Sequence, residues 1–104
     1  MSKIKMPKSG ETGQLLWRYD PKDSSLTLSG TGALPDYPIG KAPWFEFNDQ
    51  IDTLVLKEGV TRIGDYAFYN CTELTSVEIP EGVTYIGESA FACCQSLESV
   101  TIPG

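Results

Sequence analysis

The stretch Ile51–Glu73, IDTLVLKEGVTRIGDYAFYNCTE, is followed at once by a second version of itself, Leu74–Ser96, LTSVEIPEGVTYIGESAFACCQS. The two 23-residue blocks are identical at nine positions, and a third block, LESVTIPG, begins at Leu97. A fixed period of this size is typical of a solenoid, in which each repeat stacks on its neighbour to bury its apolar side. The repeat therefore decides the fold.

Each block begins with alternating apolar and polar residues, as in Thr53–Leu56. This alternation predicts a half-buried strand whose leucines face inward. A glycine-containing turn then leads into a second short strand. In that strand we expect Val60 and Ile63, and their counterparts Val83 and Ile86, to face inward.

The last part of each block, residues 65–71 and 88–94, is predicted to form a short helical turn. An acidic residue at its start suits the positive end of a helix, and Phe68 and Cys71, three residues apart, would lie on one face. We expect Phe68 and its counterpart Phe91 to stack as the core of this side.

The shared pattern LxxVxIPxGVxxIGxxAFxxC resembles the leucine-rich repeat of BspA-like bacterial surface proteins, over 54 of the 104 residues. The resemblance implies a mainly β fold with short helical turns, a leucine-rich-repeat solenoid with an N-terminal β-hairpin cap. It also implies a parent protein that is exported to the cell surface and binds a protein or glycan macromolecule.

Three segments are expected along the chain. Residues 1–8 resemble an expression leader placed before a cloned segment, and they are expected to be disordered; with no secretory signal visible, the chain is interpreted as a recombinant fragment. Residues 9–50 are predicted to cap the apolar end of the first repeat. Residues 51–104 hold the repeats 51–73 and 74–96 and the partial repeat 97–104.

Two segments of the cap alternate in polarity, Gln14–Tyr19 and Ser25–Ser29, with turn-forming residues between them. This arrangement predicts a β-hairpin with one apolar face. Trp17 lies at the centre of the pattern and is predicted to be a core anchor. The polar segment Ser9–Gly13 that precedes the hairpin is expected to be mobile.

The rest of the cap contains little that predicts regular structure. Gly30–Gly40, with three glycines and two prolines, is predicted to be a connecting loop. In Ala42–Gln50, Pro43 suits the first position of a short helix. The aromatic residues of that helix are expected to act as a lid.

The charge of the chain argues against two classes of partner. Its net charge is −6, and no Lys or Arg occurs from Ile63 onward. An acidic surface repels phosphate backbones and anionic lipids, which argues against nucleic acid and membrane surfaces. No stretch approaches the ~18 consecutive apolar residues of a membrane helix, so no membrane insertion is expected.

The residue types give little support for catalysis. Histidine is absent, so the commonest general base and transition-metal ligand is missing. No serine lies in a GxSxG motif, and the carboxylates show no spacing that isolates a pair. We therefore expect a protein that is not an enzyme, with no cofactor and no metal site.

The three cysteines are expected to be free. Cys71 and Cys94 occupy equivalent positions, and stacked side chains stand about 4.8 Å apart, more than the ~3.8 Å between the Cβ atoms of a disulfide. Both are predicted to be buried thiols. Cys93 is expected to face solvent, where it is open to oxidation between chains.

The candidate interaction surface consists of outward positions on adjacent coils, because packing fixes the inward ones. It comprises Thr53, Ser76, Ser99, Val55, Glu78, Thr101, Arg62 and Tyr85. Only three strands of the predicted array are present, about 10 Å of stacking at ~4.8 Å per strand, so the chain alone is expected to bind weakly. The alternative is a structural or engineered minimal repeat scaffold with no ligand of its own.

The predicted strand of the partial repeat has no coil after it. Its candidate edge residues are Leu97, Val100 and Ile102. An apolar edge strand is a template for pairing with another chain, so we expect a homodimer in which two such strands pair about a twofold axis. The alternative is that residues 97–104 fray.

Overall fold

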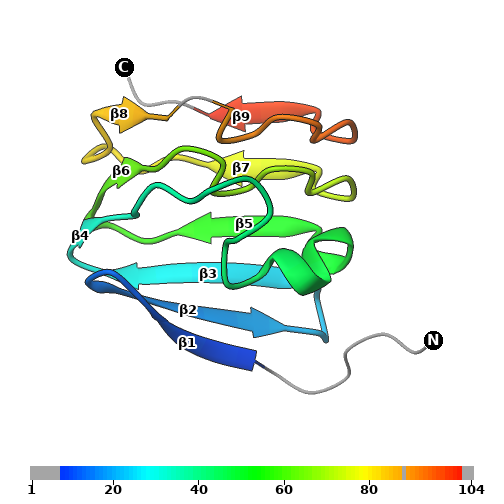
Figure 1. The fold of residues 1–104 in the computed structure, drawn as a ribbon, viewed down its shortest axis with the longest axis horizontal. Coiled ribbons are helices and arrows are strands. Elements are labelled where there is room, and N and C mark those ends of the chain that lie inside the picture. The colour runs from blue at the N-terminus through cyan, green and yellow to red at the C-terminus, as the bar shows by residue number, and fades with distance from the viewer. Residues whose placement is uncertain (1–7, 88, 102–104) are drawn as a thin grey trace.

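The structure is a computed structural model that describes residues 8–87 and 89–101, with the backbone alone for residues 99–101 (Figure 1). In these residues, two sheets and one 3-10 helix make up the fold. In chain order the elements are β1 (Lys8–Thr12), β2 (Leu15–Asp20), β3 (Ser25–Gly30), β4 (Gly32–Ala33), η1 (Phe45–Gln50), β5 (Thr53–Leu56), β6 (Val60–Ile63), β7 (Ser76–Glu78), β8 (Tyr85–Ile86) and β9 (Ser99–Thr101).

The strands form a six-stranded sheet, in the order β1-β2-β3-β5-β7-β9, and a three-stranded sheet, β4-β6-β8. In the six-stranded sheet β1, β2 and β3 are antiparallel neighbours, whereas β3, β5, β7 and β9 run parallel. Figure 1 shows the coils stacked one above another; the pairs β3 and β4, β5 and β6, and β7 and β8 each give one strand to each sheet. The predicted fold class, a mainly β solenoid with a β-hairpin at its N-terminal side, is confirmed.

The hairpin of β2 and β3 is as predicted, but the expectation that Ser9–Gly13 is mobile is wrong. Lys8–Thr12 forms β1, which pairs with β2 along its whole length. The cross-strand pair Gly10 and Trp17 favours this pairing, because a side chain on Gly10 would begin 2.9 Å from the indole nitrogen of Trp17. Only glycine leaves room for that ring.

The segment 25–50, here called the cap coil, is a degenerate copy of the repeat. Its strand β3 pairs in parallel with β5, so that Leu26 lies beside Leu54. The predicted connecting loop contains β4, which pairs in parallel with β6, and the amide of Leu34 donates to the carbonyl of Arg62 at 2.9 Å. The repeats therefore stack on a coil of their own kind.

Residues 65–71 form consecutive turns rather than a helix. Tyr66 and Asn70 have left-handed backbones, with φ of 57° and 64°, and the corresponding Ser89 and Cys93 have φ of 55° and 63°. These turns direct amide groups toward the next coil: the amide of Phe68 donates to the carbonyl of Ala90 at 2.8 Å. A continuous helix would have used those amides within its own coil.

The repeated glycine of each block marks a close approach of two coils. A side chain on Gly64 would overlap the backbone of Pro35 in the cap coil. At Gly87 the added atom would lie 2.6 Å from the backbone nitrogen of Asp65, one coil below. Glycine recurs at this position because the neighbouring backbone occupies the space of a side chain.

The core lies between the two sheets and contains the predicted inward residues Leu54, Leu56, Val60 and Ile63, all 6% exposed or less. Ile86 is different: it was expected to face inward, yet 38% of its surface is exposed. β8 is the last strand of its sheet in the described chain, so no further strand covers this side.

Aromatic rings form the core on the turn side of the coils. Phe68 stacks on Phe91 as predicted, with centroids 5.5 Å apart, and on its other side it stacks on Trp44 at 5.4 Å. The indole nitrogen of Trp44 donates to the carbonyl of Ala67 at 2.8 Å. Trp17 is 8% exposed and packs edge-on against Trp44, which confirms it as a core anchor.

In residues 8–87 and 89–101 helical structure is limited to η1, whose Phe47 is fully buried against Trp17 and Tyr19. A short helix therefore lies within Ala42–Gln50, but it begins at Phe45, so the expectation that Pro43 takes its first position is wrong. In the described part of the chain, no helix has the length and apolar character needed to cross a membrane.

We expect Phe68→Ala to lower the free energy of unfolding by about 3–5 kcal/mol, because the ring is buried between two others. Tyr66→Asn is the control, since Asn tolerates a left-handed backbone and Tyr66 is only half-buried. Urea titrations measure both variants, and we expect the loss for Tyr66→Asn to stay below about 1 kcal/mol. Equal losses would contradict the ring stack.

Candidate interaction surface

The outer face of the six-stranded sheet holds the predicted interaction residues Thr53, Val55, Ser76 and Glu78. Parallel pairing aligns Thr53 with Ser76 and Ser99, and Val55 with Glu78 and Thr101. Ser76 and Glu78 are exposed, whereas Thr53 and Val55 are half-buried beside them. The two columns are thus contiguous on one surface, and their role in binding stays a prediction.

Arg62 and Tyr85 belong to the three-stranded sheet, so they do not extend those two columns. The guanidinium of Arg62 lies 4.6 Å from the centre of the Tyr85 ring and forms an ion pair with Asp36 at 2.9 Å. Both partners stabilise the cation in place. This set links three successive coils, and the guanidinium of Arg62 is engaged within the protein.

Asp36 is the electrostatic centre of this link. Its carboxylate accepts a hydrogen bond from the amide of Asp65 at 2.8 Å and pairs with the guanidinium of Arg62. The hydrogen bond from Asp65, followed by that from Arg62, holds the pKa of Asp36 below its ordinary value of 3.8. The hydrogen bond to Asp36 also raises the pKa of Arg62. Sequence reasoning missed Asp36, because it lies in the segment interpreted as a loop.

The outer face is wider than the sequence suggested. The expectation of three strands counted only β5, β7 and β9, but β1, β2 and β3 continue the same sheet. Six strands leave five gaps of about 4.8 Å, or about 24 Å of stacking. The reason is that the hairpin continues the sheet beside the repeats, with β3 paired in parallel with β5.

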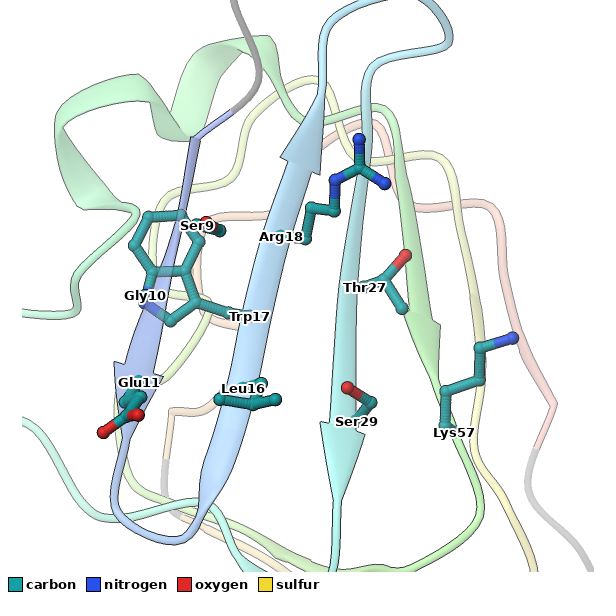
Figure 2. A pocket seen from close by; sticks show the side chains of 9 residues that line it. All are labelled: Ser9, Gly10, Glu11, Leu16, Trp17, Arg18, Thr27, Ser29 and Lys57. Carbon is teal, nitrogen blue, oxygen red and sulfur yellow. The ribbon is translucent and has the colours of Figure 1, made fainter.

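A hollow of about 550 Å³ lies on this face over β1, β2 and β3 (Figure 2). It is lined by Ser9, Gly10, Glu11, Leu16, Trp17, Arg18, Thr27, Ser29 and Lys57. Leu16 is 52% exposed there, between the inward-facing Leu15 and Trp17. Sequence reasoning missed the hollow, although an apolar residue at an outward position of β2 was the available signal.

The thiols have the predicted positions: Cys71 and Cys94 are buried, Cys93 is exposed, and all three are free. The Sγ atom of Cys94 donates to the carbonyl of Phe68 at 3.2 Å. A hydrogen bond with Cys94, together with burial, raises the pKa of Cys71. Cys71 is therefore an inert thiol at neutral pH.

The predicted dimer edge is described in part. Leu97 packs against the core and is partly buried. The backbone of Val100 pairs with Val77, since β9 follows β7 in the sheet order. Ile102 lies outside the described residues.

Within residues 8–87 and 89–101, no group of three or more His, Cys, Asp or Glu side chains is arranged to hold a metal ion. The outward side chains of the six-stranded sheet include hydroxyls, charged groups and an exposed leucine. Such a surface offers hydrogen bonds, ion pairs and apolar contact to a partner.

The Asp36 link predicts a pH dependence. Above pH 3.8 the folded and unfolded chains both carry a charged Asp36, and its stabilising contribution is fully present. As the pH falls through the lowered pKa of the folded state, the carboxylate is protonated and the contribution is lost. We expect the wild type to be more stable than Asp36→Asn at neutral pH, with a difference that shrinks as the pH falls below 3.8.

Urea denaturation at several pH values measures this difference. Glu58→Gln, a change at an exposed carboxylate, is the matched control and is expected to have little effect at any pH. A difference between the wild type and Asp36→Asn that does not change with pH would contradict the proposed link.

The family described as "BspA type Leucine rich repeat region (6 copies)" matches residues 41–104. No curated protein matches the chain. Among solved structures, a leucine-rich repeat protein from Eubacterium ventriosum ATCC 27560 matches with a TM-score of 0.86 and 34% sequence identity. The match covers 93% of this chain and 26% of that one, so this chain spans about a quarter of its length. The stacked coils and the family match confirm the resemblance: the chain belongs to the BspA-type leucine-rich repeat family.

Proposed function

We propose that the chain is a non-catalytic interaction module that binds a macromolecular partner through the outer face of its six-stranded sheet. One observation carries the proposal: inward residues repeat from coil to coil, whereas outward residues change. Leu54 and Val77 are both buried and apolar, but the outward Val55 is replaced by Glu78 in the next coil. Outward positions are free to match a partner because packing does not fix them.

The dimensions of the face also support binding. About 24 Å of stacked strands with exposed side chains is a width that a protein partner can cover. The absence of histidine agrees with a role in binding rather than catalysis.

We further propose that the parent protein presents this face at the bacterial cell surface, as an adhesin-type molecule. Support comes from the BspA-type family match to residues 41–104. The acidic charge of −6 agrees with a partner other than nucleic acid. The alternative, a scaffold with no ligand of its own, predicts that no partner distinguishes the outer face from the rest of the surface.

Binding of the labelled chain to arrays of extracellular proteins and of glycans tests the proposal. Ser76→Arg places a long cation in the middle of the outer face and is expected to reduce each wild-type signal at least fivefold. Thr61→Arg is the matched control, because Thr61 is exposed on the three-stranded sheet. Loss of signal in both variants, or no signal for the wild type, would contradict the proposal.

We also propose that two chains pair through β9. Two observations support this: β9 ends the six-stranded sheet as described, and the adjacent end of the other sheet exposes Tyr85 by 47% and Ile86 by 38%. Pairing about a twofold axis would cover both ends at once.

Light scattering during size-exclusion chromatography tests the dimer. The wild type is expected to be dimeric, and Val100→Lys monomeric and less stable, because a charge in β9 opposes pairing between edge strands. A wild type that is monomeric at high micromolar concentration would end this proposal.

A further inference from the structure

We infer that the hollow over β1, β2 and β3 is a docking site for a short acidic protein segment, in which an apolar side chain is flanked by carboxylates. The inference rests on the proposed function and names the class of partner. It is carried by an exposed leucine and two cations that form no ion pair among the described residues, all lining one hollow on an acidic protein.

Leu16 provides the apolar contact. Antiparallel pairing places it between Glu11 on β1 and Ser29 on β3, and Figure 2 shows its side chain between theirs. With 52% of its surface exposed, Leu16 is among the most exposed large apolar residues of the described chain. A partner's apolar side chain placed on it would remove both from water.

Arg18 and Lys57 provide the positive charge. Both are exposed, both line the hollow, and among the described residues neither forms an ion pair. Two other cations are already engaged: Lys8 pairs with Glu46, and Arg62 with Asp36. On a protein of net charge −6, this hollow is therefore a local site for carboxylates.

The register fixes how the two cations are arranged. Leu16 pairs with Ser29 across the strands, and Lys57, just after β5, is level with both. Arg18 points outward two residues further along β2, where it pairs with Thr27. Two strand gaps and two residues of rise separate the backbones of Arg18 and Lys57 by about 12 Å. Their long side chains can therefore hold two separate carboxylates of an extended segment.

Glu11 sets the orientation of that segment. It lies on the β1 side of Leu16, away from Lys57, so a carboxylate bound there would be repelled. The carboxylates of the partner are expected beside Arg18 on β2 and Lys57 after β5, and a backbone amide rather than a carboxylate over β1. This asymmetry makes the site selective for a sequence rather than for negative charge in general.

The same residues favour a peptide over a glycan. Among the described outward residues of the six-stranded sheet there is no aromatic ring, and Trp17, which lines the hollow, is only 8% exposed. The hollow thus lacks an aromatic platform on which a sugar ring could lie. Its exposed leucine and cations match an apolar side chain and carboxylates instead.

Fluorescence polarisation with a labelled peptide, GSELDEGS, tests the inference on the full chain at low salt. We expect measurable binding that falls at least tenfold for Arg18→Glu and for Lys57→Glu and weakens with added salt. Lys22→Glu is the matched control: Lys22 is exposed in the turn between β2 and β3, outside the lining of the hollow, and is expected to change binding less than twofold. Thermal denaturation checks that each variant folds.

Two further peptides separate charge from apolar contact. Replacing the leucine by serine, GSESDEGS, is expected to weaken binding by the wild type severalfold but to have little effect with Leu16→Ser, because the contact is then already lost. The basic peptide GSKLKKGS is expected not to bind.

Several results would overturn the inference: no binding of GSELDEGS at millimolar concentration, equal binding of the basic peptide, or equal losses for Lys22→Glu and Arg18→Glu. If proteins on the arrays bind and are lost with Ser76→Arg but not with Arg18→Glu, the hollow is not the docking site, while the proposed function stands. If the arrays give no signal, the proposed function fails, and the peptide titration alone decides on the hollow.

Discussion

The contact between Trp44 and the first repeat decides whether the cap coil and the repeats share one core. The ring of Trp44 continues the stack of Phe68 and Phe91, and the indole nitrogen of Trp44 donates a hydrogen bond to the carbonyl of the buried Ala67. A stack of coils is held together only by contacts between neighbours, so each interface must be complete. The outer face depends on the interface between the cap coil and the first repeat. At this interface β3 lies beside β5, which places the hollow beside the column of Thr53 and Ser76.

Much of this architecture could be predicted because the two repeats have similar residues wherever the packing requires them. Leucine at position 54 and valine at 77 face the same core, glycine at 64 and 87 meets the same close backbone, and the buried thiols of Cys71 and Cys94 lie one above the other. Where two copies agree, packing is the cause, and the inward positions can be identified without a structure. Ile86 shows the limit of this reasoning, since its exposure depends on what covers the last coil.

The cap coil and the hollow could not be predicted in the same way. Leu26, Leu28 and Leu34 take the positions of Leu54, Leu56 and Ile63, but the spacing is one residue shorter and the glycine and phenylalanine signals are missing. Backbone hydrogen bonds keep the coil in register, and these do not depend on side-chain identity. The hollow combines residues from β1, β2, β3 and the end of β5, which become neighbours only through the sheet.

The antiparallel β1 and β2 give the solenoid a direction. Neither has a partner strand in the three-stranded sheet as described. A coil added beside β1 could therefore pair one of its strands with β1, but its other strand would have no neighbour to pair with. The other end, at β8 and β9, offers a strand in both sheets. Further coils could therefore be added only at the end of β8 and β9, where they would take the place of the proposed pairing between chains, and each would extend the molecule by about 4.8 Å. In such an array, the number of coils would set the distance between the hollow and a second contact on the same face.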